Sequence, residues 1–438
     1  MLPLLDWNRL TESERAAALQ RPANAVQGAV FATAQTLIDR VRSGGDGAAR
    51  DITRELDGVA LDSLRVSPAE VNSANADLPA AARTALDRAI ANVRCFHAAQ
   101  LPAALAIETL PGVLCERRSV PLNKVGLYVP AGSAPLPSTA IMLGVPAQIA
   151  GCPLRVLCTP PRPDGRADPA TLHVARQCGI EHIYKIGGAQ AIAAMAYGTE
   201  SIPKTDKVFG PGNVWVTAAK LLVSRDPGGA ACDLPAGPSE VLVIADETAR
   251  ADFVAADLLA QAEHSPDAQA VLVTTSAALA RETSTQVEAQ MQRLSRREIL
   301  RRSLASARII LVDDLATAIA VSNAYAPEHL ILQVRQPRQW LEQVRCAGSV
   351  FLGPWSPEPM GDYCTGTNHV LPTGGYARAY SGLSLMDFLR HLTVQELTQA
   401  GLADLGPTAQ TLANLEGLDA HASAVAIRLK ALAERGVA

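Results

Sequence analysis

The pattern of hydrophobic and polar positions changes near residue 125. Before that point apolar residues recur at helical spacing, most clearly in an Ala-rich stretch near residues 80–98, so about the first 120 residues are predicted to be mostly helical. After it, short β-branched runs alternate with segments of helical length. This alternation is typical of βα units, in which a helix follows each strand and covers the sheet.

The strand-like runs form two series. The first series comprises VGLYVP (125–130), RVLCTP (155–160), HIYKIGG (182–188) and DKVFGPGN (206–213). The second comprises EVLVIADE (240–247), QAVLVTT (269–275), RIILVD (308–313), HLILQV (329–334) and SVFLG (349–353). The two series predict an α/β protein with two Rossmann-like domains, each built on a parallel, doubly wound sheet, and small helical extensions at both ends.

We expect four parts along the chain. Residues 1–25 form a helical arm, and residues 26–124 join 240–384 in a first Rossmann-like domain. Residues 125–239 form the second such domain, and 385–438 form a helical tail without strands. Because that tail is too small for a core of its own, it is expected to pack on a second subunit.

Composition narrows the class of protein. The chain has 438 residues, 48% hydrophobic and only 4% aromatic, which predicts two to four domains with aliphatic cores. Its formal charge is −4, without a basic stripe or charged tail, so no nucleic-acid partner is expected. The eight cysteines include no C-x-x-C pair, which argues against a disulfide framework and a thiolate zinc site.

The sequence also disfavours export and membrane insertion. The first twenty residues carry charges where a signal peptide has an apolar core. The long uncharged stretch 125–154 contains five prolines, so it is a poor spanning helix. We therefore expect a cytoplasmic protein with no membrane partner.

One candidate metal site lies in QAEH (261–264), at the end of a helix that Pro266 terminates. Gln261 and His264 are three residues apart, so they share one face, and the helix dipole favours a cation there. An ordinary solvated or core-satisfied pair is the alternative interpretation. A metal ion needs further ligands from elsewhere in the chain.

Two more polar stretches supply further candidates. YAPEHL (325–330) places Glu328 beside His329, where adjacent residues of extended chain point to opposite faces and could flank a substrate as separate bases. A helix-to-strand connector with a solvated Glu328 is the alternative. The long irregular segment 354–382 has the length of a functional loop and carries Asp362 and His369.

The tail supplies a fourth stretch, EGLDAHASA (416–424), with Glu416 and His421. Carboxylate oxygen and imidazole nitrogen suit zinc or a similar divalent ion. Glycine-rich turns at GPGNVW (210–215), Gly132–Ser133 and Gly187–Gly188 offer helix-start N–H groups to a pyrophosphate, although none matches G-x-G-x-x-G.

Five motifs together resemble the histidinol dehydrogenase family in order and spacing: FGPGN, DLPAGPSE, LLAQAEHSPDAQAVLVT, NAYAPEHL and GDYCTGTNHVLPT. The resemblance runs from about Val30 to the C-terminus. It implies oxidation of L-histidinol to L-histidine through L-histidinaldehyde, the last steps of histidine biosynthesis, with two NAD⁺ reduced. It also implies one Zn²⁺ per subunit and a homodimer.

The resemblance implies a role for each matching residue. The implied zinc ligands, which also contact substrate, are Gln261, His264, Asp362 and His421. The implied acid–base pair is Glu328 and His329, with His329 also at substrate. The other implied substrate residues are Ser239, His369 and Glu416. The implied NAD residues are Tyr128, Gln190 and Asn213. In the family Glu416 and His421 act in the partner's site.

Three other functions are weighed against this one. A cysteine could attack an aldehyde, but Cys115 and Cys152 lack an obvious neighbouring base. A related zinc and NAD dehydrogenase could oxidise another primary alcohol, although His369 and Glu416 favour histidinol. A zinc hydrolase or a metal-binding protein without catalysis would not need the glycine-rich turns. Cys364 lies close enough to Asp362 in sequence to be a stray thiolate ligand.

Overall fold

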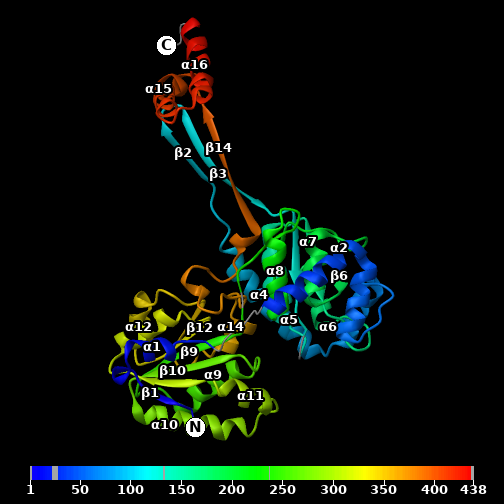
Figure 1. Cartoon of the computed structure of the whole chain (residues 1–438), viewed down its shortest axis with the longest axis vertical. Helices are drawn as coiled ribbons and strands as arrows, with labels where there is room; N and C mark the ends of the chain where they lie inside the picture. The colour runs from blue at the N-terminus through cyan, green and yellow to red at the C-terminus, as the bar shows by residue number, and fades with distance from the viewer. Residues whose placement is uncertain (1, 22–27, 132–133, 236, 436–438) are drawn as a thin grey trace.

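Two parallel sheets organise the chain, and a narrow arm projects from them (Figure 1). The computed structural model describes residues 2–21, 28–131, 134–235 and 237–435. The first sheet has the strand order β1 (Leu4–Asp6), β11 (Arg308–Leu311), β10 (Gln269–Thr274), β9 (Glu240–Ala245), β12 (His329–Gln333) and β13 (Ser349–Leu352). The second has the order β6 (His182–Lys185), β5 (Leu154–Thr159), β4 (Lys124–Tyr128), β7 (Lys207–Phe209) and β8 (Ala231–Cys232). Neighbouring strands are parallel in both sheets, which confirms the predicted α/β class.

Helices cover both faces of the six-stranded sheet. Alternate side chains of β9 enter two separate cores, Val241 under α9 (Ala251–Ala262) and Leu242 under α12 (Leu315–Tyr325). All six residues of β9 are buried, and a strand buried on both faces needs a continuous apolar run such as VLVIA. The α9 side is completed by α10 (Ala277–Met291) and α11 (Arg297–Leu304).

The five-stranded sheet is covered in the same way. Its helices are α5 (Pro137–Ala150), α6 (Pro169–Gln177), α7 (Gly188–Tyr197) and α8 (Val214–Arg225). Leu127 of β4 packs in a core with α5 and α6, whereas its neighbour Tyr128 packs in a core with α7 and α8. None of the helices in the described part of the chain has the length and apolar character that crossing a bilayer requires.

The N-terminal helices lie on the five-stranded sheet, which corrects their assignment to the domain of the six-stranded one. α2 (Gly28–Asp57) contacts α7 and α8, α3 (Pro68–Asp77) contacts α6, and α4 (Ala80–Ala98) contacts α5 and α6. Val93 of α4 is buried in the same core as Leu127. Helical periodicity predicts that these segments are helices, but it does not say which sheet their apolar faces cover.

The two ends of the chain also differ from the expectation. The predicted helical arm contains α1 (Glu12–Ala18) but begins with β1, which pairs with β11. The predicted strandless tail begins with β14 (Leu389–Leu397), which pairs antiparallel with β3 (Val113–Pro121). β3 pairs in turn with β2 (Leu105–Leu110), so the mostly helical region before residue 125 contains two strands.

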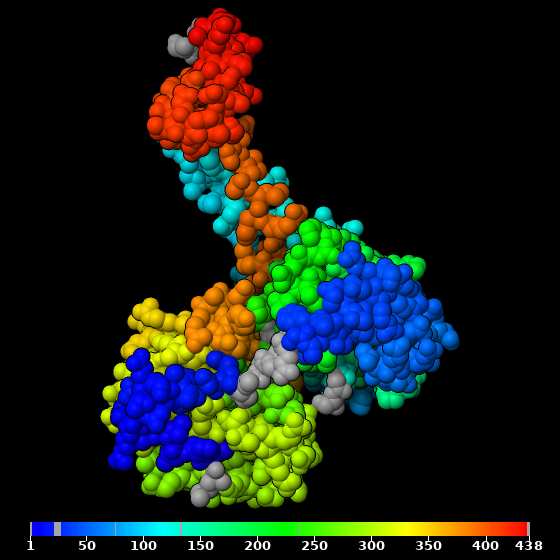
Figure 2. Space-filling model, viewed as in Figure 1, coloured from blue at the N-terminus to red at the C-terminus, as the bar shows by residue number. Residues whose placement is uncertain are grey.

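This three-stranded ribbon forms the stem of the arm and carries α15 (Gln399–Leu415) and α16 (Asp419–Glu434) away from the two lobes (Figures 1 and 2). Every residue of β2 is exposed. β3 has one buried residue, Val113, but no strand of the ribbon has a continuous buried face, so the ribbon lacks the apolar alternation that identifies a strand in sequence.

Candidate active site

The predicted acid–base residues and three of the four predicted metal ligands, Gln261, His264 and Asp362, converge at the amino-terminal edge of the six-stranded sheet. Ser239 directly precedes β9, and Glu328 and His329 stand at the start of β12. A helix that connects parallel strands runs back along the sheet, so the end of α9 returns Gln261 and His264 to this same edge.

His329 is the buried centre of the site. Its Nδ1 lies 3.2 Å from the Glu240 carbonyl oxygen and 2.9 Å from Gln261 Oε1. Both oxygens accept hydrogen bonds, so Nδ1 carries the proton and Nε2 is the basic nitrogen of the neutral ring. Nε2 is buried without a hydrogen-bond partner, 3.6 Å from Asp362 Oδ1 and 3.8 Å from Glu358 Oε1.

Glu328 is buried next to this imidazole. Its Oε2 accepts a hydrogen bond of 2.8 Å from the Glu240 N–H and lies 3.6 Å from His329 Nδ1. The expected opposite orientation of the two side chains is therefore wrong: β12 begins at His329, so the alternation of a strand does not extend to Glu328.

Burial and charge shift both pKa values. Burial raises the pKa of Glu328 to about 8, against the opposing effect of His329. Burial by itself would lower the pKa of His329, but the carboxyl groups of Glu328, Asp362 and Glu358 outweigh it and raise that pKa to about 10. The pair can therefore hold and exchange a proton.

The metal donors gather around Asp362, which lies on α14 (Glu358–Tyr363), inside the segment predicted to be a loop. One ligand atom each of His264, Glu358 and Asp362 lies within 4.8 Å of the others. Burial opposes ionisation of Asp362, but the close contact with His329 and the nearby His369 hold its pKa below the usual range.

Buried polar atoms around this cluster lack partners. Within the described part of the chain, Gln261 Nε2, His329 Nε2 and Glu358 Oε1 have no hydrogen-bond partner. Orphaned buried polar atoms are rare and call for a ligand that satisfies them. A set of imidazole, carboxylate and amide donors fits a zinc ion.

The predicted substrate residues of this chain lie between the two lobes. Ser239, Glu328 and His369 line one small pocket together with the 210–212 turn. His369 Nδ1 donates to the Asp362 carbonyl oxygen at 2.7 Å, and its Nε2 lies 3.2 Å from Thr139 Oγ1 on α5. His369 therefore links the metal cluster to the five-stranded lobe.

The predicted NAD residues lie together on the other side of this junction. Tyr128, Gln190 and Asn213 line a groove of about 860 Å³ at the carboxyl edge of the five-stranded sheet. β4 continues to β5 on one side, whereas β7 and β8 lie on the other side, so the groove opens at a topological switch point, where nucleotides bind in doubly wound folds.

Local geometry explains the turns beside the groove. The Tyr128 hydroxyl accepts a hydrogen bond of 3.1 Å from the Gly188 N–H at the start of α7, and Asn213 caps α8. Gly210 has φ +128°, and a Cβ there would meet the Tyr128 carbonyl oxygen at 2.1 Å, so only glycine fits. The Gly132–Ser133 turn lies outside the described residues.

Two predicted site residues are not brought to the others within one chain. Glu416 and His421 are exposed at the end of α15 and on α16, at the tip of the arm (Figure 2). A single chain thus assembles His264, Gln261 and Asp362 but leaves His421 apart.

Neither of the two candidate cysteines, Cys115 and Cys152, is placed to act as a nucleophile in the candidate site. Cys115 lies on the ribbon, paired with Ile107 and Gln395. Cys152 is buried, its thiol donates to the Phe388 carbonyl oxygen, and burial raises its pKa to about 11. A thiol held in that form is a poor nucleophile.

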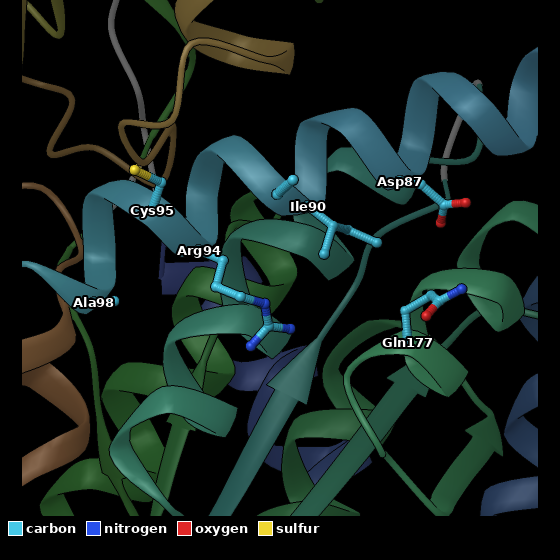
Figure 3. Close-up of a pocket in the computed structure, with 7 residues that line it drawn as sticks. Asp87, Ile90, Arg94, Cys95, Ala98 and Gln177 are labelled. Atoms are coloured by element: carbon cyan, nitrogen blue, oxygen red, sulfur yellow. The ribbon is translucent and has the colours of Figure 1, made fainter.

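A further hollow of about 570 Å³ lies between α4 and the end of α6 (Figure 3). Its lining includes Asp87, Arg94, Cys95 and Gln177 and none of the predicted site residues. Arg94 donates a hydrogen bond to Gln148 Oε1. This hollow is separate from the candidate active site.

Comparison with known proteins agrees with the motifs. Residues 19–429 match the family model described as histidinol dehydrogenase. The chain belongs to the histidinol dehydrogenase family. It is 55% identical over 428 residues to the histidinol dehydrogenase of Xanthomonas axonopodis pv. citri (strain 306), covering 98% of this chain and 99% of the relative. It is 54% identical over 430 residues to that of Vibrio vulnificus (strain CMCP6), covering 98% and 99%.

A solved structure agrees as well. The crystal structure of histidinol dehydrogenase from Elizabethkingia anophelis is similar with a TM-score of 0.94 and 45% identity, over 98% of each chain. The chain and the histidinol dehydrogenase of known structure therefore share the fold over nearly their whole length. The resemblance that the five motifs indicate is confirmed at the level of the family.

Within this histidinol dehydrogenase fold, two buried carboxylates lie at the candidate site although the sequence analysis gave them no role. Glu358 lies four residues before Asp362, on the same face of α14. Glu240 forms an ion pair with Arg21 and accepts a hydrogen bond of 2.7 Å from the Gly374 N–H. The i, i+4 spacing of Glu358 and Asp362 is a signal in the sequence, but it has meaning only once that segment is read as helix.

Proposed function

We propose that this protein is an NAD-dependent dehydrogenase that oxidises L-histidinol to L-histidine through L-histidinaldehyde. The observation that carries the proposal is the convergence of the Glu328–His329 pair and the His264–Asp362 donors at the junction with a nucleotide-type groove. Family membership supports the substrate. Histidinol carries imidazole and amino nitrogens, which are groups that a zinc site, His369 and a carboxylate such as Glu416 can recognise.

A zinc ion would be held by Gln261, His264 and Asp362 of one chain together with His421 of a second chain. When bound, zinc supplies a Lewis-acidic centre that binds the nitrogen donors of the substrate and so positions its carbinol group. The protein's own side chains then carry the proton transfers.

In the first oxidation the neutral form of His329 acts as the base, so this step should become faster as the pH rises towards the raised pKa of the ring. Its unpartnered Nε2 takes the hydroxyl proton as the carbinol carbon gives a hydride to the nicotinamide. The Glu240 carbonyl and the Gln261 amide oxygen keep the Nδ1 proton in place, which fixes the tautomer that this step needs. The products are the aldehyde, NADH and a proton.

The second oxidation requires water. Glu328 takes a proton from the water whose oxygen adds to the aldehyde carbon, and the hydrate that forms then loses its hydride to a second NAD⁺. The burial that raises the pKa of Glu328 makes its carboxylate a stronger base than an exposed glutamate. In total, one alcohol, one water and two NAD⁺ give one carboxylate, two NADH and three protons.

We infer a homodimer with shared sites. Large apolar side chains remain exposed along the arm, among them Ile107, Leu412, Leu415 and Ile427. Such a surface is stabilised by a partner, and a second copy would receive Glu416 and His421 in its site. The eight free cysteines fit the reducing cytoplasm that we propose as its compartment.

The proposal is tested by supplying purified zinc-loaded protein with NAD⁺ and L-histidinol and identifying the product by chromatography. L-Histidine and NADH are expected. A primary alcohol without the imidazole should react far more slowly, and equal rates would favour the related dehydrogenase with another substrate. A zinc hydrolase would form no NADH at all.

A further inference from the structure

Glu358 is a buried carboxyl group that the proposed reaction does not use. Its residue is only 1% exposed, and its Oε1 has no hydrogen-bond partner in the described part of the chain. That oxygen lies 3.8 Å from His329 Nε2. A carboxylate oxygen of Glu358 also belongs to the cluster in which the ligand atoms of His264 and Asp362 lie within 4.8 Å.

This position is unfavourable for a carboxyl group in the absence of a cation. Glu358 and Asp362 project from one face of α14, so the buried Glu358 lies beside a second acidic group, Asp362, whose side chain is only 14% exposed. Moving a charged carboxylate out of water costs several kcal/mol unless an opposite charge compensates it, and a second carboxylate adds repulsion. The ion pair that Glu358 makes is with the His329 ring, which also serves Asp362.

A divalent cation removes this imbalance. Gln261 and the histidines are neutral donors, so Asp362 alone would leave one of the two positive charges of zinc uncompensated. A second carboxylate would neutralise the site. Exposed His264 lies at the mouth of the cluster, so an ion can reach it from solvent.

We propose that Glu358 supplies a second carboxylate to the divalent cation in the substrate-free enzyme, beside Asp362. This inference rests on the metal site of the proposed function. It assigns Glu358 to metal binding, in addition to the four ligands implied by the family resemblance.

The test is the isosteric substitution Glu358→Gln, which removes the charge and keeps the shape. Zn²⁺ and Co²⁺ affinities are measured by chelator competition, and the visible absorption spectrum of the Co²⁺ form reports the ligands. We expect affinity to fall at least tenfold and the Co²⁺ spectrum to change. Glu358→Asp, which keeps the charge, should recover part of the affinity. Glu263→Gln is the matched control, because Glu263 adjoins His264 just after α9 but is not one of the clustered donors, so this variant should bind both ions as wild type does.

Thermal melting separates metal binding from a structural role. Without metal, Glu358→Gln should melt no lower than wild type, since the amide has the shape of the carboxyl group and removes an acidic group buried beside Asp362. With metal bound, it should melt lower than wild type. A lower melting temperature in both forms would show a structural role and overturn the inference. Tight binding by wild type and Glu358→Gln alike, with the same Co²⁺ spectrum, overturns this inference alone. A wild-type protein that binds neither ion overturns the proposed zinc site as well.

Discussion

At the scale of single residues, the groups that contact the two ring nitrogens of His329 define the candidate site. The ring's Nδ1 lies within hydrogen-bond distance of the Glu240 carbonyl oxygen and of Gln261 Oε1. The carboxyl groups of Asp362 and Glu358 face its Nε2. Glu328 lies on the Nδ1 side, with its Oε2 fixed by a backbone N–H. Glu328 therefore lies near Nδ1 of the His329 ring, whereas Nε2, the nitrogen proposed as the other base, is on the opposite side of the ring. This arrangement permits each base to serve a different oxidation.

The division predicts unequal effects of Glu328→Gln on the two steps. The amide oxygen can still accept the hydrogen bond from the Glu240 N–H, so the local geometry should persist. Oxidation of histidinaldehyde should fall by about 100-fold or more, a loss typical of removing a general base, whereas the first hydride transfer from histidinol should fall much less. Single-turnover NADH formation from each substrate measures both. Equal losses on the two substrates would contradict the assigned role of Glu328.

The metal ligands give a second prediction at this scale. Gln261→Ala and His264→Asn should lose zinc yet keep the fold, because Gln261 lies in the last turn of α9 and His264 lies beyond the end of that helix. Metal content by elemental analysis and circular dichroism are measured on the same samples. Glu263→Gln is again the control. Stoichiometric zinc in both variants would show that the ligand assignment is wrong.

Individual site residues such as Gln261 and His264 could be predicted from sequence, but their shared helix face was wrong, because α9 ends at Ala262 and His264 lies in the bend beyond it. Glu358 could not, because a short helix inside a proline-rich segment has no recognisable periodicity. The contact between Glu328 and His329 could not either, since it depends on where β12 begins.

At the scale of elements, buried strands were predictable and exposed ones were not. The strands of both sheets stand out because burial on two faces demands apolar runs, as in β9 and β10. The ribbon strands lack that signal because solvent surrounds them. Neither the packing of α2 on α7 nor that of α4 on α5 follows from the helical period.

The helix α9 also contains a titrating group that its sequence does not reveal. Asp257 is 5% exposed, and its carboxyl accepts a hydrogen bond of 2.6 Å from Gln333 Nε2 at the end of β12. Burial raises its pKa to about 7. The folded state therefore holds a proton that the unfolded chain releases near pH 4, so the stability due to this group is lost as the pH rises from about 4 to 7.

Asp257→Asn should abolish this pH-dependent loss of stability, because the amide of asparagine is neutral at every pH and needs no proton. The variant should exceed wild type in stability at pH 8 by on the order of 2–4 kcal/mol, and by much less at pH 5. Urea unfolding at both pH values measures this. Asp252→Asn, on the same helix but largely exposed, should show no such gain. A difference between Asp257→Asn and wild type that does not vary with pH would contradict the expected titration.

At the scale of the whole molecule, two opposite sheet edges meet. The carboxyl edge of the five-stranded sheet carries the groove that we propose for NAD, and the amino edge of the six-stranded sheet carries the proposed metal donors and bases. The arm carries Glu416 and His421 out of reach of both (Figure 1). The family resemblance implies these residues, and their distance from both edges within one chain is the reason that we propose a second chain to supply them.

Shared sites predict complementation between inactive variants. A dimer of one His264→Asn chain and one His421→Asn chain has one site with both defects and one site with neither. Refolding an equal mixture should make about half of the dimers hybrid, so roughly a quarter of all sites should regain activity. Each variant refolded alone is the control. A mixture that contains hybrid dimers and is no more active than its parents would place each tail at its own chain's site.

The most direct measurement is the amount of NADH formed per L-histidinol consumed by the zinc-loaded protein. A site that holds the aldehyde, hydrates it with Glu328 and oxidises it again before release should give two NADH and one L-histidine for each histidinol. One NADH per histidinol, with free aldehyde accumulating, would contradict the assignment of both oxidations to this site.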